Sequence, residues 1–294
     1  MKVLIIGKDG QLGNCLKKKV KQYELTHKFT FIGRNELDFN SNSNIENYFK
    51  NNVFDITINC AAYTAVDKAE SEKETANQVN HLAVKQLAKE VLNQGGKLIH
   101  ISTDYVFDGL KKSQYEETDK TNPINVYGKT KLDGENAVKK ILSNNGMIIR
   151  VSWVYSEFGN NFVKTMLRMG NNHKNISVVK DQIGSPTNAN DLAGAILSII
   201  QKNDYLERDF ETETYHFSNE GEISWYDFAQ EIFKISNFKC SINSVSSSKY
   251  PTLALRPKNT SMNKTKIKTK FNIELMSWEK SLEVFLNEKN LNLS

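Results

Sequence analysis

Two residues with complementary acid–base chemistry lie four positions apart in the run Val126-Tyr-Gly-Lys-Thr-Lys131. The run is expected in a helix, where residues i and i+4 share a face, so the Tyr127 phenol and the Lys131 ammonium can point into one pocket. A free tyrosine has a pKa of about 10, and a nearby cation favours its ionised form. The pair is therefore a candidate for proton transfer near neutral pH, although this spacing is also common by chance.

A glycine-rich segment near the N-terminus predicts a phosphate site. It stands between a short apolar strand, Val3–Ile6, and a predicted helix, Gln11–Tyr23. Glycines permit a tight turn, and a helix N-terminus offers N–H groups to a phosphate. The spacing is GxxGxxG and departs from the GxGxxG fingerprint, so an ordinary strand–helix turn is the alternative. Its position after the first strand favours a nucleotide cofactor, bound by Gly7, Gly10, Gln11, Leu12 and Gly13.

The second predicted strand, Phe29–Ile32, bears on the choice of cofactor. Arg34 follows it, where an acidic residue would bind the ribose of NAD and an arginine can bind the 2′-phosphate of NADP. We therefore predict NADPH, with NADH as the alternative because Asp38 lies close by. Asp38 and Phe39 are assigned to the cofactor site as well.

Two further strand ends carry candidate site residues. The third strand, Asp55–Asn59, is followed by the small residues Ala61 and Ala62, with Tyr63 beside them. Small residues here would let a cofactor pack directly on the backbone, although a tight turn explains them equally well. The fourth strand, Lys97–Ser102, continues into Thr103 and Asp104. Polar side chains just beyond an apolar strand are expected to face the cleft, where a hydroxyl can bond a substrate oxygen.

Apolar strands alternate with helical patterns up to about residue 152, which predicts an α/β fold with a Rossmann-type, doubly wound parallel sheet. Ser43 and Glu46 match a capping box that would open one helix, and 66–93 reads as a long helix broken at most once. We predict a dinucleotide-binding domain at 1–152, completed by parts of 176–217. Residues 153–294 would form mainly a smaller C-terminal substrate-binding lobe.

Composition narrows the class of protein. The chain has 294 residues, of which 39% are hydrophobic and 25% charged, and it has no apolar run of membrane length. Three cysteines without CxxC spacing indicate reduced thiols and a cytoplasmic protein, and the five dispersed histidines indicate no metal site. The net charge of +5 suits an anionic small substrate, because the lysine clusters lack the interleaved aromatics expected of a nucleic-acid surface.

Beyond these local patterns, the chain resembles the extended short-chain dehydrogenase/reductases, and among them the dTDP-4-dehydrorhamnose reductase family. The resemblance spans nearly the whole chain, and the sequences STDYVFDG and GNNFVKTMLR are its most specific segments. The matching segments are Gly7–Gly13, Asn59–Glu70, Ser102–Gly109, Pro123–Lys131, Arg150–Tyr155, Gly159–Arg168, Asp181–Thr187 and Arg256-Pro257.

The resemblance implies a hydride transfer from NADPH or NADH to C4 of dTDP-4-dehydro-L-rhamnose, giving dTDP-L-rhamnose for cell-surface polysaccharide. Tyr127 would donate the proton, Lys131 would hold the nicotinamide ribose and lower the tyrosine pKa, and Thr103 would orient the substrate oxygen. Sugar contacts are implied for Asp104 and Trp153, and a diphosphate contact for Arg256. Core packing is the alternative for Trp153, and helix capping is expected of Asn160 and Asn161.

The chain also departs from the family pattern. Some members carry glutamates that bind Mg²⁺ at a dimer interface, where this chain has Asn14, Cys15 and Asn190. We therefore expect no metal, and a monomer or a weak homodimer. Related 4,6-dehydratases have a glutamate after the aspartate where this chain has Tyr105, which favours a reductase. The other alternative is a non-catalytic NADP-binding regulatory subunit. It is less favoured because the chain keeps Thr103, Tyr127 and Lys131.

Overall fold

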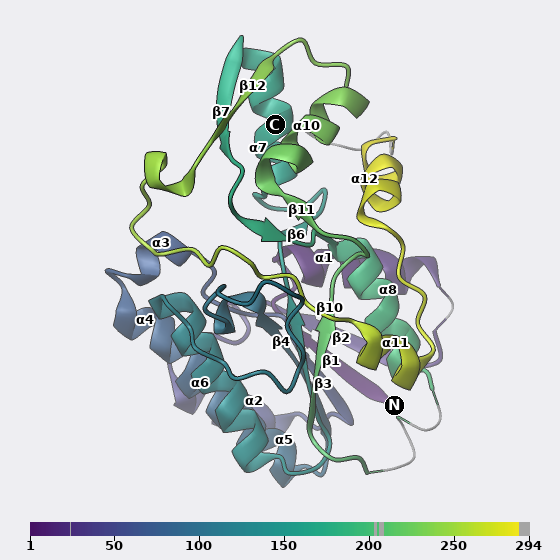
Figure 1. The fold of residues 1–294 in the computed structure, drawn as a ribbon. Helices are drawn as coiled ribbons and strands as arrows, with labels where there is room; N and C mark the ends of the chain where they lie inside the picture. The colour runs from purple at the N-terminus through teal and green to yellow at the C-terminus, as the bar shows by residue number, and fades with distance from the viewer. Residues whose placement is uncertain (24, 203–204, 206–208, 288–294) are drawn as a thin grey trace.

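Six parallel strands form the central sheet of the computed structural model, which describes residues 1–23, 25–202, 205 and 209–287 (Figure 1). Alternate residues of each inner strand are buried on opposite faces, as parallel sheets covered by helices require. The predicted Rossmann-type sheet is confirmed. In spatial order the strands are β10 (Glu213–Phe217), β5 (Gly146–Val151), β4 (Lys97–Thr103), β3 (Ile56–Asn59), β1 (Lys2–Ile6) and β2 (Lys28–Ile32).

The order of the strands reverses at β1. From β1 the chain first adds β2 on one side, and then β3, β4, β5 and β10 on the other. Ligands of doubly wound sheets bind at such a switch point, outside the carboxyl ends of the strands. The loops after β1 and β3 therefore mark the expected cofactor site.

Helices cover both faces of the sheet (Figure 1). The face with Val3 and Ile5 packs against α1 (Gln11–Gln22), α8 (Ala189–Ile200) and α11 (Thr265–Phe271). The face with Leu4 and Ile6 packs against α2 (Asn42–Asn51), α5 (Ala83–Asn93) and α6 (Val126–Ile141). The second half of the chain thus returns to the sheet through β10, α8 and α11.

One helix boundary differs from the sequence-based expectation. The helix α2 begins at Asn42 after Ser41, so Ser43 lies inside its first turn and the predicted capping box is wrong. The region predicted as a long helix over 66–93, broken at most once, is helical with a single break at residues 70–72. Its parts are α3 (Val66–Ala69), α4 (Lys73–Asn77), a π-helical turn (Gln78–Leu82) and α5.

A smaller lobe follows β5 in the chain and lies beyond the carboxyl ends of the strands (Figure 1). A parallel strand pair, β7 (Asn175–Val179) and β12 (Ser241–Val245), packs there with α7 (Phe162–Asn172), α10 (Trp225–Ile235) and α12 (Trp278–Asn287). Within 176–217, β7 therefore lies in this lobe, whereas α8 and β10 join the sheet domain.

Other features of this half of the chain complete the description. Two short strand pairs connect the lobe to the sheet domain: β6 (Val154–Tyr155) with β9 (Thr187–Asn188), and β8 (Ile183–Gly184) with β11 (Ile223–Ser224). Asn161 caps α7 by accepting the Lys164 N–H, as predicted. Residues 288–294 of the predicted lobe lie outside the described residues. Within the described part of the chain, no helix combines the length and apolarity needed to cross a bilayer.

Two helix-interior glycines give a matched test of how closely α6 packs. A Cβ on Gly134 of α6 would lie 2.3 Å from the Asn80 carbonyl oxygen, whereas one on Gly194 of α8 would have no neighbour nearer than 3.7 Å. We expect Gly134→Ala to lower the free energy of unfolding by about 1–3 kcal/mol through overpacking. Gly194→Ala should raise it by up to about 1 kcal/mol through helix propensity. Urea unfolding midpoints measure both changes, and equal effects at the two sites would contradict the packing argument.

Candidate active site

The glycine loop after β1 is packed too tightly for side chains. Gly7 has a φ of +92°, and a Cβ there would lie 2.8 Å from the Ala61 nitrogen. A Cβ on Gly13 would lie 2.1 Å from the Gly7 oxygen. Gly10 is the N-cap of α1 and makes no side-chain cap bond. The first-turn N–H groups of α1, which have no intrahelical acceptor, are therefore suited to hold a phosphate.

The side chains of Gln11 and Leu12 do not point toward this loop. Leu12 is 7% exposed and packs in the core between α1 and the sheet. The Gln11 amide nitrogen donates to the Val154 carbonyl at 3.3 Å, and its oxygen accepts from Ser156 Oγ and Asn161 Nδ2, both at 3.0 Å. Gln11 and Leu12 thus offer a cofactor only their main-chain groups, while the Gln11 side chain joins α1 to the second lobe.

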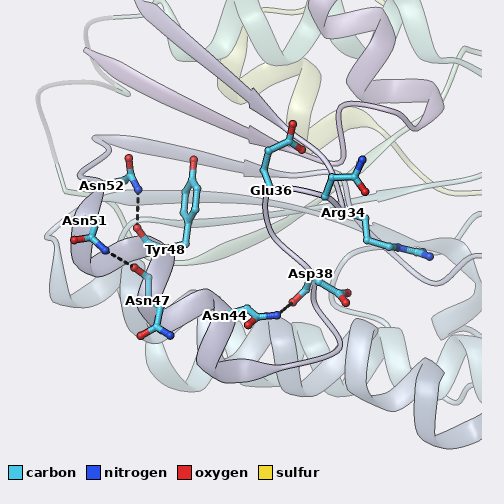
Figure 2. A pocket seen from close by; sticks show the side chains of 9 residues that line it. Arg34, Glu36, Asp38, Asn44, Asn47, Tyr48, Asn51 and Asn52 are labelled. Carbon is cyan, nitrogen blue, oxygen red and sulfur yellow. Dashed lines mark hydrogen bonds between the residues drawn. The ribbon is translucent and has the colours of Figure 1, made fainter.

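Arg34 lies on an exposed loop after β2, at the edge of a pocket of about 450 Å³ with a polar lining, and its guanidinium extends away from Tyr48 (Figure 2). Glu36 on the same loop forms an ion pair with Lys8, and this contact is the main reason that the pKa of the Glu36 carboxyl is lowered. Asp38 accepts the Asn40 N–H at 3.0 Å. The other residues that line the pocket are Asn35, Asn44, Asn47, Tyr48, Asn51 and Asn52.

Phe39 directs its side chain into the core that α2 and α5 cover, where it is 5% exposed. Its carbonyl oxygen accepts a hydrogen bond from Gln78 Nε2 at 2.9 Å. A stacking role for this ring against a cofactor is therefore excluded, and only the main chain of Phe39 can contribute to the predicted site.

The loop after β3 is held in place by Asn80, a residue that no sequence pattern indicated. Asn80 is fully buried on the π-helical turn. Its side chain accepts the Tyr63 N–H at 2.8 Å and donates to the Tyr63 carbonyl at 3.1 Å and to Thr130 Oγ1 at 3.2 Å. Asn80 therefore fixes the segment with Ala61, Ala62 and Tyr63 relative to α6.

Thr103, Asp104 and Tyr127 meet where β4 ends and α6 begins. Thr103 is buried, donates to Asp104 Oδ1 at 3.0 Å and accepts the Tyr105 N–H at 3.2 Å. The Thr103 hydroxyl also lies close enough to the Tyr127 phenol to lower its pKa, although burial has the larger, opposite effect. The Tyr105 ring lies edge-on to the Tyr127 ring, 5.8 Å between centroids. The structure thus brings the predicted hydroxyl, carboxyl and phenol together.

Lys131 lies one turn further along α6 and is 1% exposed. Its Nζ donates to the Ile101 carbonyl at 2.7 Å, and burial lowers the pKa of the ammonium to about 8. Burial raises the pKa of Tyr127 to about 12 and outweighs the lowering by the neighbouring Thr103 hydroxyl. Our expectation of a lowered tyrosine pKa is therefore wrong for this structure, because loss of solvation exceeds any stabilisation of the phenolate.

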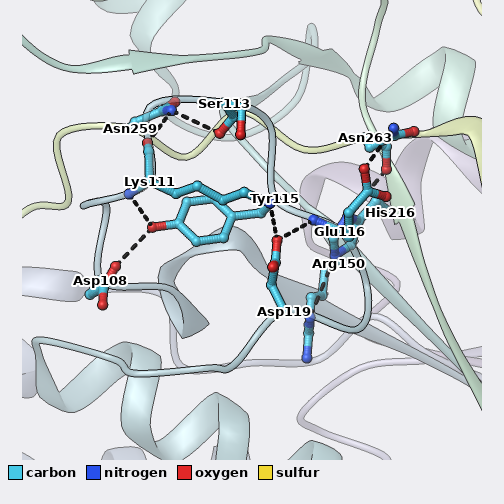
Figure 3. A network of polar contacts seen from close by, with 10 residues as sticks. All are labelled: Asp108, Lys111, Ser113, Tyr115, Glu116, Asp119, Arg150, His216, Asn259 and Asn263. Atoms are coloured by element: carbon cyan, nitrogen blue, oxygen red, sulfur yellow. Dashed lines mark hydrogen bonds and ion pairs between the residues drawn. The ribbon is translucent and has the colours of Figure 1, made fainter.

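A buried ion pair between Glu135 and Arg150 lies next to Lys131 and was not predicted from the sequence. Glu135 on α6 accepts from Arg150 Nε at 2.9 Å, from Arg150 Nη2 at 2.7 Å and from Ser102 Oγ at 2.5 Å. Arg150 also faces His216 Nε2 at 3.5 Å, and burial lowers the pKa of His216 to about 3. Figure 3 shows Arg150 and His216 beside the loop over residues 108–119. The spacing of Glu135, eight residues after Tyr127, is the signal that could have revealed it.

The predicted substrate residues in the second half of the chain have protein partners. Trp153 stacks on Trp225 with 3.5 Å between ring centroids, so the packing alternative describes its observed contact. Arg256 forms a two-pronged ion pair with Asp67 at 3.0 and 2.7 Å. A contact of either residue with a substrate stays a prediction.

The places of the family's metal-binding glutamates hold side chains with other contacts. Asn14 Nδ2 donates to the Gly10 carbonyl at 3.0 Å, and Asn190 Nδ2 donates to Glu157 Oε2 at 2.8 Å. Cys15 is buried in the core. Among the residues with described positions, no three His, Cys, Asp or Glu side chains cluster as metal ligands would.

A glycine cradle at the switch point, with a hydroxyl, a phenol and an ammonium beside it, defines an oxidoreductase of the short-chain dehydrogenase/reductase type. Comparison with known families gives the particular member of this class. The chain belongs to the RmlD substrate binding domain family, whose model matches residues 1–291.

Individual relatives match over nearly their whole length. A dTDP-4-dehydrorhamnose reductase of Aggregatibacter actinomycetemcomitans is 40% identical, covering 96% of this chain and 97% of the relative. The spore coat polysaccharide biosynthesis protein SpsK of Bacillus subtilis is 34% identical, covering 98% of each. The crystal structure of dTDP-4-dehydrorhamnose reductase from Bacillus anthracis in complex with NADP is 38% identical, with a TM-score of 0.90, covering 98% of this chain and 99% of that one.

Asp104 gives a pH-dependent prediction. Burial raises the pKa of its carboxyl from 3.8 to about 6, so the folded state binds the proton more tightly and stability falls as pH rises through about 6. Asp104→Asn removes the charge and keeps an oxygen that can accept from Thr103. We expect it to raise the free energy of unfolding at pH 7 by about 2–3 kcal/mol, and by little near pH 4. Urea unfolding at both pH values measures this, and an equal gain at both would contradict it.

Proposed function

We propose that the protein reduces the C4 keto group of dTDP-4-dehydro-L-rhamnose with NADPH and releases dTDP-L-rhamnose for polysaccharide synthesis. The observation that carries this proposal is the convergence of Thr103, Tyr127 and Lys131 beside the glycine cradle. The relatives support the choice of substrate, since the 40% identical protein is a dTDP-4-dehydrorhamnose reductase. A cytoplasmic location and a monomer or weak homodimer stay predictions.

The residues of the site fit a dinucleotide. A Cβ on Gly7 or Gly13 would meet backbone atoms within 3 Å, so this loop has no room for side chains. The N–H groups of Gly7, Lys8 and Gly10 already donate to backbone carbonyls, so the first-turn N–H groups of α1 that follow Gly10 are the ones that a pyrophosphate can use. We assign the pyrophosphate to the main chain of Gly10–Gly13, the nicotinamide side to the loop over residues 61–63, and the ribose to Lys131. When bound, NADPH supplies the hydride. Arg34 supports the choice of NADPH over NADH, together with the relative crystallised with NADP.

Tyr127 is suited to act as the proton donor in a reduction. Because the pKa of its phenol is raised to about 12, the side chain keeps its proton at neutral pH. An alkoxide that develops at C4 is far more basic and can take this proton. The Thr103 hydroxyl, which lies beside the Tyr127 phenol, would orient the same substrate oxygen. These two groups together account for the acid half of the reaction.

The remaining predicted contacts define where the nucleotide sugar would lie. Asp104 and Trp153 would face the sugar, and Arg256 would bind the diphosphate while Asp67 orients the guanidinium. The dehydratase alternative lacks its second acid, because Tyr105 stands in that place and burial raises the pKa of its phenol. A reductase therefore remains the better fit to the side chains.

Cofactor consumption tests the reaction directly. We expect the purified protein to oxidise NADPH, followed at 340 nm, only when a dTDP-4-keto-6-deoxyhexose is added, and to use NADH more slowly because of Arg34. Binding of the keto-sugar without consumption of either cofactor would rule out the reductase function and would favour a regulatory role.

Replacement of the proposed acid tests the site. Tyr127→Phe removes the proton and keeps the ring, so turnover should fall by roughly two to four orders of magnitude with little change in the NADPH dissociation constant. Tyr226→Phe is the matched control and should leave turnover unchanged, because this half-buried side chain of α10 packs in the second lobe and its hydroxyl bonds only to Gln230 among described partners. Similar rates for Tyr127→Phe and the parent would exclude Tyr127 as the acid.

A further inference from the structure

Glu135 continues the face of α6 that carries the acid–base pair. It follows Tyr127 by eight residues and Lys131 by four, so the three side chains lie in line along the helix. Lys131 is 1% exposed and Glu135 is fully buried. An ammonium and a carboxylate are therefore neighbours on one helix face, without the water that would normally separate their charges.

The end of β4 contacts three successive turns of this helix face. The Ile101 carbonyl accepts from Lys131 Nζ at 2.7 Å, and Ser102 Oγ donates to Glu135 Oε1 at 2.5 Å. The next strand residue, Thr103, lies close enough to Tyr127 to lower the pKa of its phenol. Two strand residues thus fix the ammonium and the carboxylate, and a third lies beside the phenol. Any change at Glu135 acts on the same strand that holds the other two.

Arg150 fixes the charge of Glu135. The guanidinium gives the carboxylate two hydrogen bonds, at 2.9 and 2.7 Å, and an arginine does not lose its proton in proteins. The Glu135 carboxylate is thus paired with the Arg150 guanidinium on one side and follows the Lys131 ammonium along the helix on the other.

We propose that Glu135 is a positioning residue, which keeps Lys131 charged and directed at the cofactor side of β4 without itself touching cofactor or substrate. The proposal deepens the proposed function and rests on it. Burial lowers the pKa of Lys131 to about 8, and Glu135 is the largest influence in the opposite direction. Without this carboxylate, the ammonium would lose its proton at a lower pH and could no longer serve as a cation for the ribose.

The surroundings supply no equivalent anion. Burial raises the pKa of the neighbouring thiol to about 12, and it lowers the pKa values of both nearby histidines, so these three groups are neutral around pH 7–8. The thiol is Cys60 after β3, and the histidines are His100 on β4 and His216 on β10. Asp104 is ionised at this pH, because its pKa is raised only to about 6, but it acts on Tyr127 and not on Lys131. Glu135 is therefore the anion that favours the charged form of Lys131.

Two variants remove the carboxylate charge. Glu135→Gln keeps its shape, and the double variant Glu135→Met with Arg150→Met removes both charges, so that no buried guanidinium is left uncompensated. In each we expect the alkaline limb of the profile of kcat/KM against pH, near pH 8 in the parent, to move down by roughly one pH unit. The NADPH dissociation constant, measured by fluorescence without turnover, should begin to rise at a correspondingly lower pH.

Two further variants separate charge from packing. Ser102→Ala removes one hydrogen bond to Glu135 but keeps the carboxylate, and Glu135→Asp keeps the charge on a shorter side chain. Both should leave the alkaline limb within experimental error of the parent. The proposal is overturned if the charge-removing variants keep the parent limb, or if Ser102→Ala moves it as far as Glu135→Gln does.

The binding titration keeps this test separate from that of the proposed function. If the parent binds NADPH but does not reduce the keto-sugar, the proposed function fails. The pH dependence of NADPH binding in the four variants still decides the role of Glu135: a shift in the two charge-removing variants alone supports it, and any other pattern overturns it.

Discussion

The close approach of α6 to the sheet domain is the constraint on which the site depends. A Cβ on Gly128 would lie 2.1 Å from the Tyr105 oxygen, and one on Gly134 would lie 2.3 Å from the Asn80 oxygen. Both contacts are with backbone, which cannot move aside as a flexible side chain can. The absence of a Cβ at Gly128 and Gly134 therefore allows the short distance between α6, which carries Tyr127 and Lys131, and the end of β4.

The parallel sheet supplies the rest of the geometry. Because its strands all run the same way, the glycine loop, the loop over residues 61–63 and Thr103 reach one edge from distant parts of the chain. Buried polar side chains then join these loops to each other, as Asn80 does for Tyr63 and Thr130. Each such bond is strong only because water is excluded from it, so the site and the domain core are stabilised together.

Local patterns in the sequence were enough for the sheet, the glycine loop and the Thr103–Tyr127–Lys131 set, since apolar runs, glycines and helix spacing each act over a few residues. The directions of Gln11 and Phe39 were not predictable, because they depend on which face a distant element covers. The pKa of Tyr127 depends on its depth of burial, which no spacing encodes. Asn80 and Arg150 contact partners 15 to 66 residues away, beyond the reach of any local pattern.

The bonds of Gln11 have a mechanical consequence. Three hydrogen bonds from this one side chain tie the first turn of α1 to Val154, Ser156 and Asn161 at the base of the second lobe. A rotation of the lobe that preserves these bonds must use this corner as its hinge axis. The main chain of Gly10–Gly13, which lies at this corner, would then move least relative to the lobe.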